Sequence, residues 1–215
     1  MVAAAGLALL VAGPAGSHPH IYIDSGLQAV FDDAGRLAAV RVIWAYDDFY
    51  SLLTLEDRGL DPDADGILTD AEVAELDGFD MNWDADYSGD LFVSQNGVDI
   101  PLSRPLDHAT TMDRGRIVTL HTRALEPRPD PADGPIVFRI YDATFYTAYT
   151  VALPTRIEGR VGCTADLFRP DLDAANRALL EALAEYGAED SLEMDFPAVG
   201  ANFADEVRLQ CAPPS

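Results

Sequence analysis

Apolar and polar residues alternate with the two-residue period of half-buried strands over much of the chain. Residues 27–31 and 37–46 show this alternation on either side of a turn at 32–35, and they predict a β-hairpin. The Asn-Gly pair at 96–97 is a typical two-residue hairpin turn between two later strands. Further strands are expected at 91–94, 98–102, 108–113, 117–123, 136–141 and 146–153.

Helical spacing of apolar residues replaces this alternation in two places. Residues 48–57 present such a face and lead into an acidic loop. Near the carboxyl end, apolar residues recur at helical spacing from Leu172 to Tyr186, where Asp171 is suited to cap the start and Gly187 the end. A final strand is expected to carry Cys211.

The acidic loop has the sequence DPDADGILTDAE and runs from residue 61 to residue 72. Carboxylates stand at loop positions one, three, five and twelve, and Gly66 stands at position six, where the chain must turn sharply. Leu68 at position eight is suited to anchor the loop to a core. The pattern predicts an EF-hand-like calcium loop, with an acidic helix-capping turn as the alternative. The expected ligands are Asp61, Asp63, Asp65, the carbonyl of Ile67, Thr69 and Glu72.

A second stretch, residues 84–95, matches the calcium pattern only in part. Acidic or hydroxyl residues occupy positions one, three and five, but Gln95 at position twelve cannot supply a bidentate carboxylate. A strand that ends in a hairpin turn explains this stretch better. The loop at 61–72 is therefore expected to lack a partner loop, which argues against a calmodulin-like opening switch.

These elements predict an α+β fold: a β-rich antiparallel domain with an inserted EF-hand-like loop and helix, residues 48–80, and a C-terminal helix. Residues 1–17 are apolar and small, and they are expected to be a signal peptide that is cleaved before His18. Residues 18–215 are then expected to form a single periplasmic domain without a transmembrane segment.

The charge of the chain is extreme for its length. Its 215 residues include 37 acids and 14 bases, all of them arginine, for a net charge of −23. Such a field repels nucleic acid and anionic membrane surfaces and attracts cations. The alternative is a solvated acidic surface without a specific partner. No nucleic-acid partner is expected.

Histidine is the candidate ligand for transition metals. The mature chain would begin with His18, Pro19 and His20, so a free amine and two imidazoles offer nitrogen ligands for copper, nickel, cobalt or zinc. Pro19 has no backbone N–H, which excludes a mode that uses successive backbone amides. The alternative is a frayed terminus. His121, on a predicted strand, is a further candidate ligand, with a hydrogen-bonded strand histidine as the alternative.

Cys163 and Cys211 are the two cysteines of the chain. In an oxidising compartment an isolated pair most simply forms a disulfide, and this spacing fits neither a CxxC motif nor a zinc cluster. The sequence offers no Ser-His-Asp or Cys-His arrangement, so no catalytic residues and no enzymatic activity are predicted.

The motifs HPHIYID, WAYDDFYS, DPDADG, LHTRAL, YDATFYTAY and FADEVRLQC follow one another in this chain. In this order they resemble a bacterial periplasmic family of unknown function labelled "ABC-type transport system, periplasmic component". Members of that family are found beside nickel/cobalt-type permeases, so the resemblance implies metal handling. The family's His-Pro-His start falls on His18 and His20, and its Tyr-Asp motif falls on Asp142, with Ala143 in place of a proline. Asp142 thereby joins the transition-metal candidates.

The expected function is that of a periplasmic divalent-metal-binding accessory protein of a nickel, cobalt, zinc or copper transport system. Calcium would stabilise the fold, and an inner-membrane metal permease would be the partner. One alternative is a calcium-dependent structural or interaction module without a transition-metal role. A second alternative is a copper-dependent oxidase.

Overall fold

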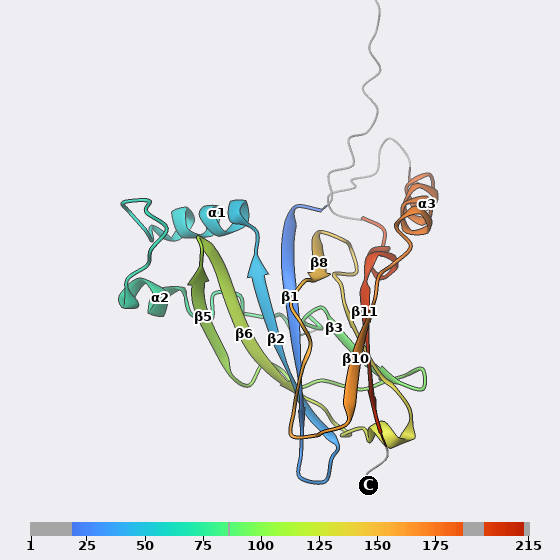
Figure 1. Cartoon of the computed structure of the whole chain (residues 1–215). Helices are drawn as coiled ribbons and strands as arrows, with labels where there is room; N and C mark the ends of the chain where they lie inside the picture. The colour runs from blue at the N-terminus through green and yellow to red at the C-terminus, as the bar shows by residue number, and fades with distance from the viewer. Residues whose placement is uncertain (1–18, 86, 187–195, 213–215) are drawn as a thin grey trace, which may run out of the picture.

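A computed structural model describes residues 19–85, 87–186 and 196–212 and has the α+β fold that the sequence predicts (Figure 1). The described strands form two sheets. The first sheet contains β1 (Ile21–Phe31), β2 (Leu37–Tyr46), β5 (His108–Asp113), β6 (Arg116–Ala124), β8 (Thr147–Val151) and β9 (Arg156–Glu158). The second contains β3 (Leu91–Gln95), β4 (Val98–Asp99), β7 (Ile136–Ile140), β10 (Cys163–Phe168) and β11 (Asp205–Cys211).

The first sheet has the order β5-β6-β2-β1-β8, and β9 also pairs with β1. The predicted hairpin at its centre is confirmed, and its first strand begins earlier than expected, at Ile21. The expectation of an antiparallel domain holds for β5, β6, β2 and β1. It does not hold for β8 and β9, which run parallel to β1. These two strands return to β1 from more than one hundred residues away, so local turns do not set their direction.

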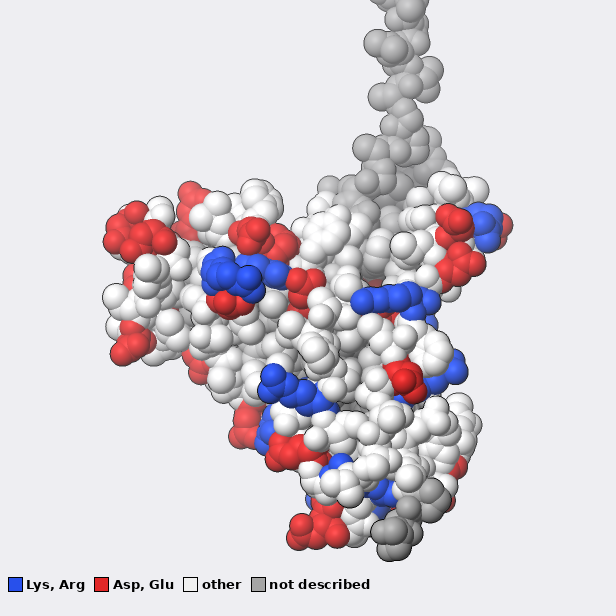
Figure 2. All heavy atoms as spheres, viewed as in Figure 1, with Lys and Arg blue, Asp and Glu red and all other residues white. Residues whose placement is uncertain are grey.

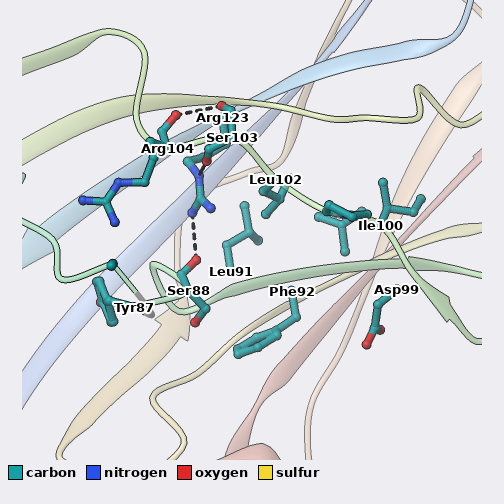
Figure 3. A pocket seen from close by; sticks show the side chains of 13 residues that line it. Tyr87, Ser88, Leu91, Phe92, Asp99, Ile100, Leu102, Ser103, Arg104 and Arg123 are labelled. Atoms are coloured by element: carbon teal, nitrogen blue, oxygen red, sulfur yellow. Dashed lines mark hydrogen bonds between the residues drawn. The ribbon is translucent and has the colours of Figure 1, made fainter.

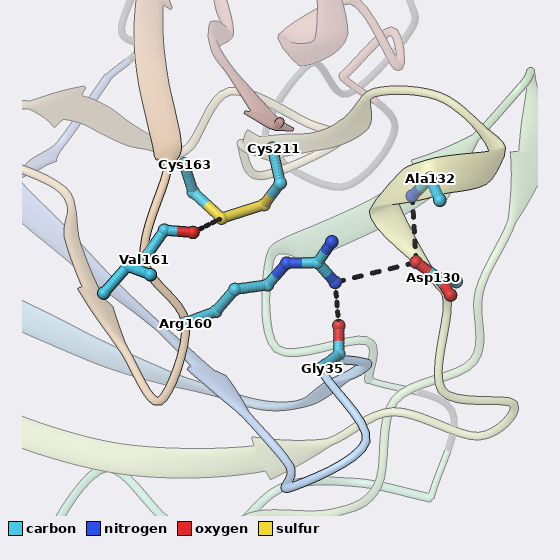
Figure 4. Close-up of a disulfide and its surroundings, with 7 residues drawn as sticks. All are labelled: Gly35, Asp130, Ala132, Arg160, Val161, Cys163 and Cys211. Atoms are coloured by element: carbon cyan, nitrogen blue, oxygen red, sulfur yellow. Dashed lines mark hydrogen bonds and ion pairs between the residues drawn. A yellow bond between two sulfur atoms is a disulfide. The ribbon is translucent and has the colours of Figure 1, made fainter. Parts of the chain in front are cut away.

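The second sheet has the order β10-β11-β7-β3-β4. The predicted disulfide is confirmed: Cys163 and Cys211 are direct partners in the β10–β11 ladder and their sulfurs are bonded (Figure 4). Beside it, Arg160 donates to the carbonyl oxygen of Gly35 and lies 3.6 Å from the carboxylate of Asp130. These contacts tie the β1–β2 hairpin to the segment that carries the disulfide (Figure 4).

The two sheets share one core. Buried side chains from both, such as Val42 and Phe31 of the first and Phe138 and Leu209 of the second, belong to a single apolar cluster. None of the helices in the described part of the chain is long and apolar enough to cross a membrane.

Three α-helices lie outside the sheets in the described residues: α1 (Asp48–Arg58), α2 (Asp70–Leu76) and α3 (Leu172–Leu183). Helix α1 ends at Arg58 and is capped by Gly59, which has φ 67°, so the helix stops before the acidic loop. Helix α3 has the expected cap, because Asp171 accepts from the N–H of Ala174 at 3.0 Å. Its expected end at Gly187 lies outside the described residues.

Candidate metal-binding sites

The loop between α1 and α2 gathers acidic side chains at one edge of the molecule (Figure 2). Carboxylate oxygens of Asp61, Asp63 and Asp65 all lie within 4.8 Å of one another. Repulsion from Asp65 is the largest of the causes that raise the pKa of Asp63. A cation between these groups would remove that repulsion, so the arrangement can serve as a cation site.

The backbone of the loop has the sharp bends that such a site needs. Gly66 has φ 76° and Ala64 has φ 55°, and both fold the chain back around Asp61. The carboxylate of Asp61 accepts from the N–H groups of Asp65 at 3.1 Å and Gly66 at 3.0 Å. Leu68 packs against the core, as expected from its position in the loop.

Glu72, the expected bidentate ligand, closes the loop. Its carboxylate accepts from the N–H of Thr69 at 2.8 Å and from the N–H of Asp61 at 3.2 Å, and it forms a capping box with Thr69 at the start of α2. The bond from the Thr69 N–H is the first cause of a lowered pKa at Glu72. Binding of calcium through Glu72 would exchange these hydrogen bonds for metal ligation.

The second acidic stretch, residues 84–95, leads into a β-hairpin, and its last residue binds backbone carbonyl groups. Gln95 ends β3, and its amide donates to the carbonyl oxygens of Asp130 at 2.7 Å and Gly134 at 2.8 Å. Asn96 and Gly97 have φ 53° and 76° and form the predicted hairpin turn between β3 and β4.

At the amino-terminal end, His18 lies outside the described residues. His20 is exposed, and its ring centroid lies 4.8 Å from that of Tyr146. Asp142 lies at the same end of the first sheet, because β1 and β8 run parallel. Its carboxylate accepts from the N–H of Thr144 at 2.9 Å and from the N–H of Thr147 at 3.0 Å, so it organises its own turn.

The structure does not bring His121 together with His20 and Asp142. His121 lies opposite Val42, which lies opposite Leu27 of β1. Leu27 is seven residues along the chain from His20, which corresponds to roughly 23 Å at about 3.3 Å per strand residue.

His121 is fully buried on the inner face of β6, at 0% exposure. Its ring meets Trp44 at 4.7 Å and Trp83 at 5.3 Å between centroids, edge-on in both contacts. Neither ring nitrogen has a hydrogen-bond partner among the described residues. Burial, with a smaller effect of Arg123, lowers the pKa of His121 to about 3, so the ring is neutral at pH 7. A neutral imidazole is the form that ligates metals.

Asp80 approaches the same inner face from the segment that follows α2. One of its carboxylate oxygens accepts from the hydroxyls of Tyr46 at 2.9 Å and Thr119 at 2.7 Å. The other is buried without a partner among the described residues. Burial raises the pKa of Asp80. We call Trp44, Asp80, Trp83, Thr119 and His121 the interior polar cluster.

A pocket of about 350 Å³ opens beside this cluster (Figure 3). In it Arg123 donates to the carbonyl oxygens of Ser88, at 2.9 Å, and Ser103. The Arg123 guanidinium lies 4.9 Å from the centre of the Trp83 ring. This guanidinium is therefore bound by neutral groups and an aromatic face rather than by a carboxylate of the described residues.

A family model described as "Protein of unknown function (DUF1007)" matches residues 3–211. The chain belongs to this family. No curated protein matches this DUF1007 chain.

Sequence reasoning missed most of the interior polar cluster of this DUF1007 protein. The alternation on β6 would by hydropathy alone turn Val118 and Leu120 inward, but the buried face carries Thr119, His121 and Arg123. The available signal was the run of polar residues at every second position of the strand, Thr119, His121 and Arg123. Asp80 gave no comparable signal, because its place depends on the path of the chain after α2.

Proposed function

We propose that this chain is an exported divalent-metal-binding accessory protein of a transition-metal transport system for nickel, cobalt, zinc or copper, with a structural calcium ion at residues 61–72. The observation that carries the proposal is the convergence of the Asp61, Asp63 and Asp65 carboxylates within 4.8 Å. Oxygen ligands from carboxylates and a backbone carbonyl suit calcium, and the glycine at position six supplies the bend that the loop requires.

The long-range field supports the same role. A net charge of −23 concentrates divalent cations near the surface, and it does so without selecting among them. Selection is left to the ligands: oxygen atoms at 61–72 for calcium, and nitrogen atoms of His18 and His20 for a transition metal. Asp142, at the same end of the first sheet as His20, would supply an oxygen ligand if its turn opened.

The transport part of the proposal rests on the resemblance to the periplasmic family labelled as a transport component. The transition metal would be cargo that passes between the amino-terminal histidines and an inner-membrane permease. The compartment rests on the apolar residues 1–17 and on the Cys163–Cys211 disulfide, which is typical of an oxidising environment.

Glu72→Gln tests the calcium site. The wild-type protein is expected to gain about 1.4–2.7 kcal/mol when calcium exceeds Kd by about 10- to 100-fold. For a chain of this length, that gain raises the melting temperature by roughly 3–10 °C. Glutamine preserves the capping box but cannot provide a bidentate carboxylate, so the variant should keep the calcium-free melting temperature and lose the calcium-dependent rise.

Glu75→Gln is the matched control, because Glu75 is an exposed residue of the same helix outside the loop. It removes the same charge and should leave the calcium-dependent rise intact. If calcium raises the melting temperature of the wild-type protein and of Glu72→Gln equally, the loop is an acidic helix cap and not a calcium site.

A calcium-dependent interaction module is the second candidate. It is favoured by apolar side chains that are exposed on α1, the helix that precedes the acidic loop: Phe49 is 67% exposed and Leu52 is 56% exposed. The two candidates differ in what they bind. A module of this kind would bind calcium alone, whereas the accessory protein binds a transition metal as well.

A further inference from the structure

Arg123 of β6 carries a buried positive charge that no acidic side chain of the described residues neutralises. The residue is 4% exposed, and it takes part in none of the ion pairs of the described chain. Burial, and to a lesser extent repulsion from Arg104, lowers the pKa of Arg123 to about 10, so the group stays protonated at pH 7. A buried charge is costly unless an opposite charge or several hydrogen bonds compensate it.

Arg104 brings a second positive charge to the same place. Its guanidinium carbon lies 5.7 Å from the centre of the Trp83 ring, and that of Arg123 lies 4.9 Å from it. Arg104 donates to the carbonyl oxygens of Asp84, at 2.6 Å, and of Trp83, and it has no ion pair with a described residue either. The groups that hold both guanidiniums are therefore neutral, and an anion between them would offset two charges at once.

The guanidinium of Arg123 keeps donors for such an anion. A guanidinium has five N–H groups. Arg123 uses one on Nε and one on Nη1 for the carbonyl oxygens of Ser103 and Ser88, so three remain, two of them on Nη2. Neighbouring N–H groups of a guanidinium match the two oxygens of a carboxylate, and such bonds are stronger than those between neutral groups.

The pocket beside these arginines has the size and lining of a small-molecule site. Its volume of about 350 Å³ falls in the range of about 300–1,000 Å³ that is typical of ligand pockets. Arg104 and Arg123 both line it, and Asp99 lies at the end away from Arg123 (Figure 3). Apolar walls come from β3 and from the segment after β4: Leu91, Phe92, Val93, Ile100, Pro101 and Leu102.

We propose that this pocket binds a small carboxylic acid with an apolar body, whose carboxylate pairs with Arg123 and Arg104. The hydrocarbon part would pack against the walls that β3 and the segment after β4 supply. These walls favour such a ligand over an inorganic anion, which has no apolar surface to bury. Both arginines repel metal ions, so the inference is independent of the proposed metal-binding function.

Sodium hexanoate titrated into the ¹⁵N-labelled chain from His18 onward, with EDTA present, tests the proposal. The NMR signal of the Trp83 indole N–H is the readout, because both guanidiniums lie over that ring. It should shift saturably, with one binding site per chain. The matched neutral compound, 1-hexanol, has the same carbon chain and no charge, so it should bind at least about 10-fold more weakly.

Two arginine variants place the carboxylate. Arg104→Gln removes an exposed side chain without opening the core, and it should weaken hexanoate affinity at least about 10-fold. Arg123→Lys keeps the buried charge but loses the paired N–H groups, so it should weaken the affinity as well. Arg156→Gln is the matched control: it removes an exposed arginine of β9 that does not line the pocket, and the affinity should stay unchanged.

Several results would overturn the inference. These are no saturable shift in the wild-type protein, equal affinities for hexanoate and 1-hexanol, unchanged affinity in either pocket variant, or an equal loss in Arg156→Gln. Asp86 lies outside the described residues, so Asp86→Asn tests whether the chain supplies the counter-charge itself. Hexanoate binding that occurs only in Asp86→Asn would also overturn the inference. Because EDTA removes metal ions throughout, none of these results bears on the proposed function.

Discussion

Gly200→Ala is expected to destabilise the protein by about 3 kcal/mol, because it forces a side chain into the backbone of a neighbouring turn. A Cβ on Gly200 would lie 1.7 Å from the carbonyl oxygen of Asp142 and 2.9 Å from its carbonyl carbon. A flexible side chain could move aside, but a carbonyl group in a turn cannot do so alone. For a chain of this length the melting temperature should fall by roughly 6–12 °C.

The contact matters because it holds the Asp142 turn in place. The N–H of Gly200 donates to the carbonyl oxygen of Ala143 at 3.0 Å, and the rings of Phe145 and Phe203 stack at 4.1 Å. These contacts fix the turn that leads into β8, next to His20 at the start of β1. The substitution should therefore loosen the amino-terminal end of the first sheet as well as lower the melting temperature.

Gly97→Ala is the control for a glycine in open space. Gly97 has φ 76° and no atom within 4 Å of a Cβ built on it, so the cost is conformational and about 1 kcal/mol. The melting temperatures of both variants, measured by thermal unfolding, show whether Gly200→Ala costs more than a glycine substitution in open space. If Gly200→Ala melts as high as Gly97→Ala, the turn at Asp142 does not dock as described.

Asp90→Asn is expected to stabilise the protein by about 2–3 kcal/mol at pH 7.5. Asp90 is 7% exposed and accepts hydrogen bonds from the hydroxyls of Tyr87 and Tyr149, both at 2.8 Å. Burial is the largest cause of its perturbation and raises the pKa of Asp90 to about 6. Its φ of 53° is one that asparagine adopts readily, so the substitution should not strain the backbone.

The pH dependence follows from the sign of this shift. The folded state holds the Asp90 proton more tightly than the unfolded state does. The contribution of this protonated carboxyl group to the free energy of unfolding is therefore fully present below about pH 4. It is lost as pH rises toward about 6, where the folded group also ionises. Asparagine carries no such proton, so the advantage of Asp90→Asn should be near zero at pH 3.5 and greatest above pH 7.

Urea unfolding at several pH values measures this difference. Asp99→Asn serves as the control, because Asp99 is an exposed residue of β4 and its substitution should change stability little at any pH. A loss of stability in Asp90→Asn at pH 7.5 would mean that the ionised carboxylate between the two tyrosines stabilises the fold.

The elements that sequence could predict are those set by local rules. Alternation and a short turn specify the β1–β2 hairpin, and the Asn96-Gly97 pair specifies the turn after β3. The spacing of Asp61, Asp63 and Asp65 within one loop likewise requires no knowledge of the fold. In each case the residues that interact are close in sequence.

The features that sequence could not predict depend on distant parts of the chain. The parallel pairing of β8 with β1 joins segments more than one hundred residues apart, and no local pattern encodes it. The register of β5 on β6 places His108 beside His121, and a shift of one residue would turn them to opposite faces. The meeting of Asp80 with Thr119 depends in turn on that register and on the docking of the segment after α2.

Equilibrium dialysis of the chain from His18 onward against micromolar zinc, in millimolar calcium to fill the proposed calcium loop, tests the proposed metal-binding function most directly. Elemental analysis then counts the zinc ions held by each chain. We expect one zinc ion in the wild-type protein, at the amino-terminal histidines, and none in His20→Ala. A folded wild-type protein that retains no zinc under these conditions would contradict the proposed metal-binding function.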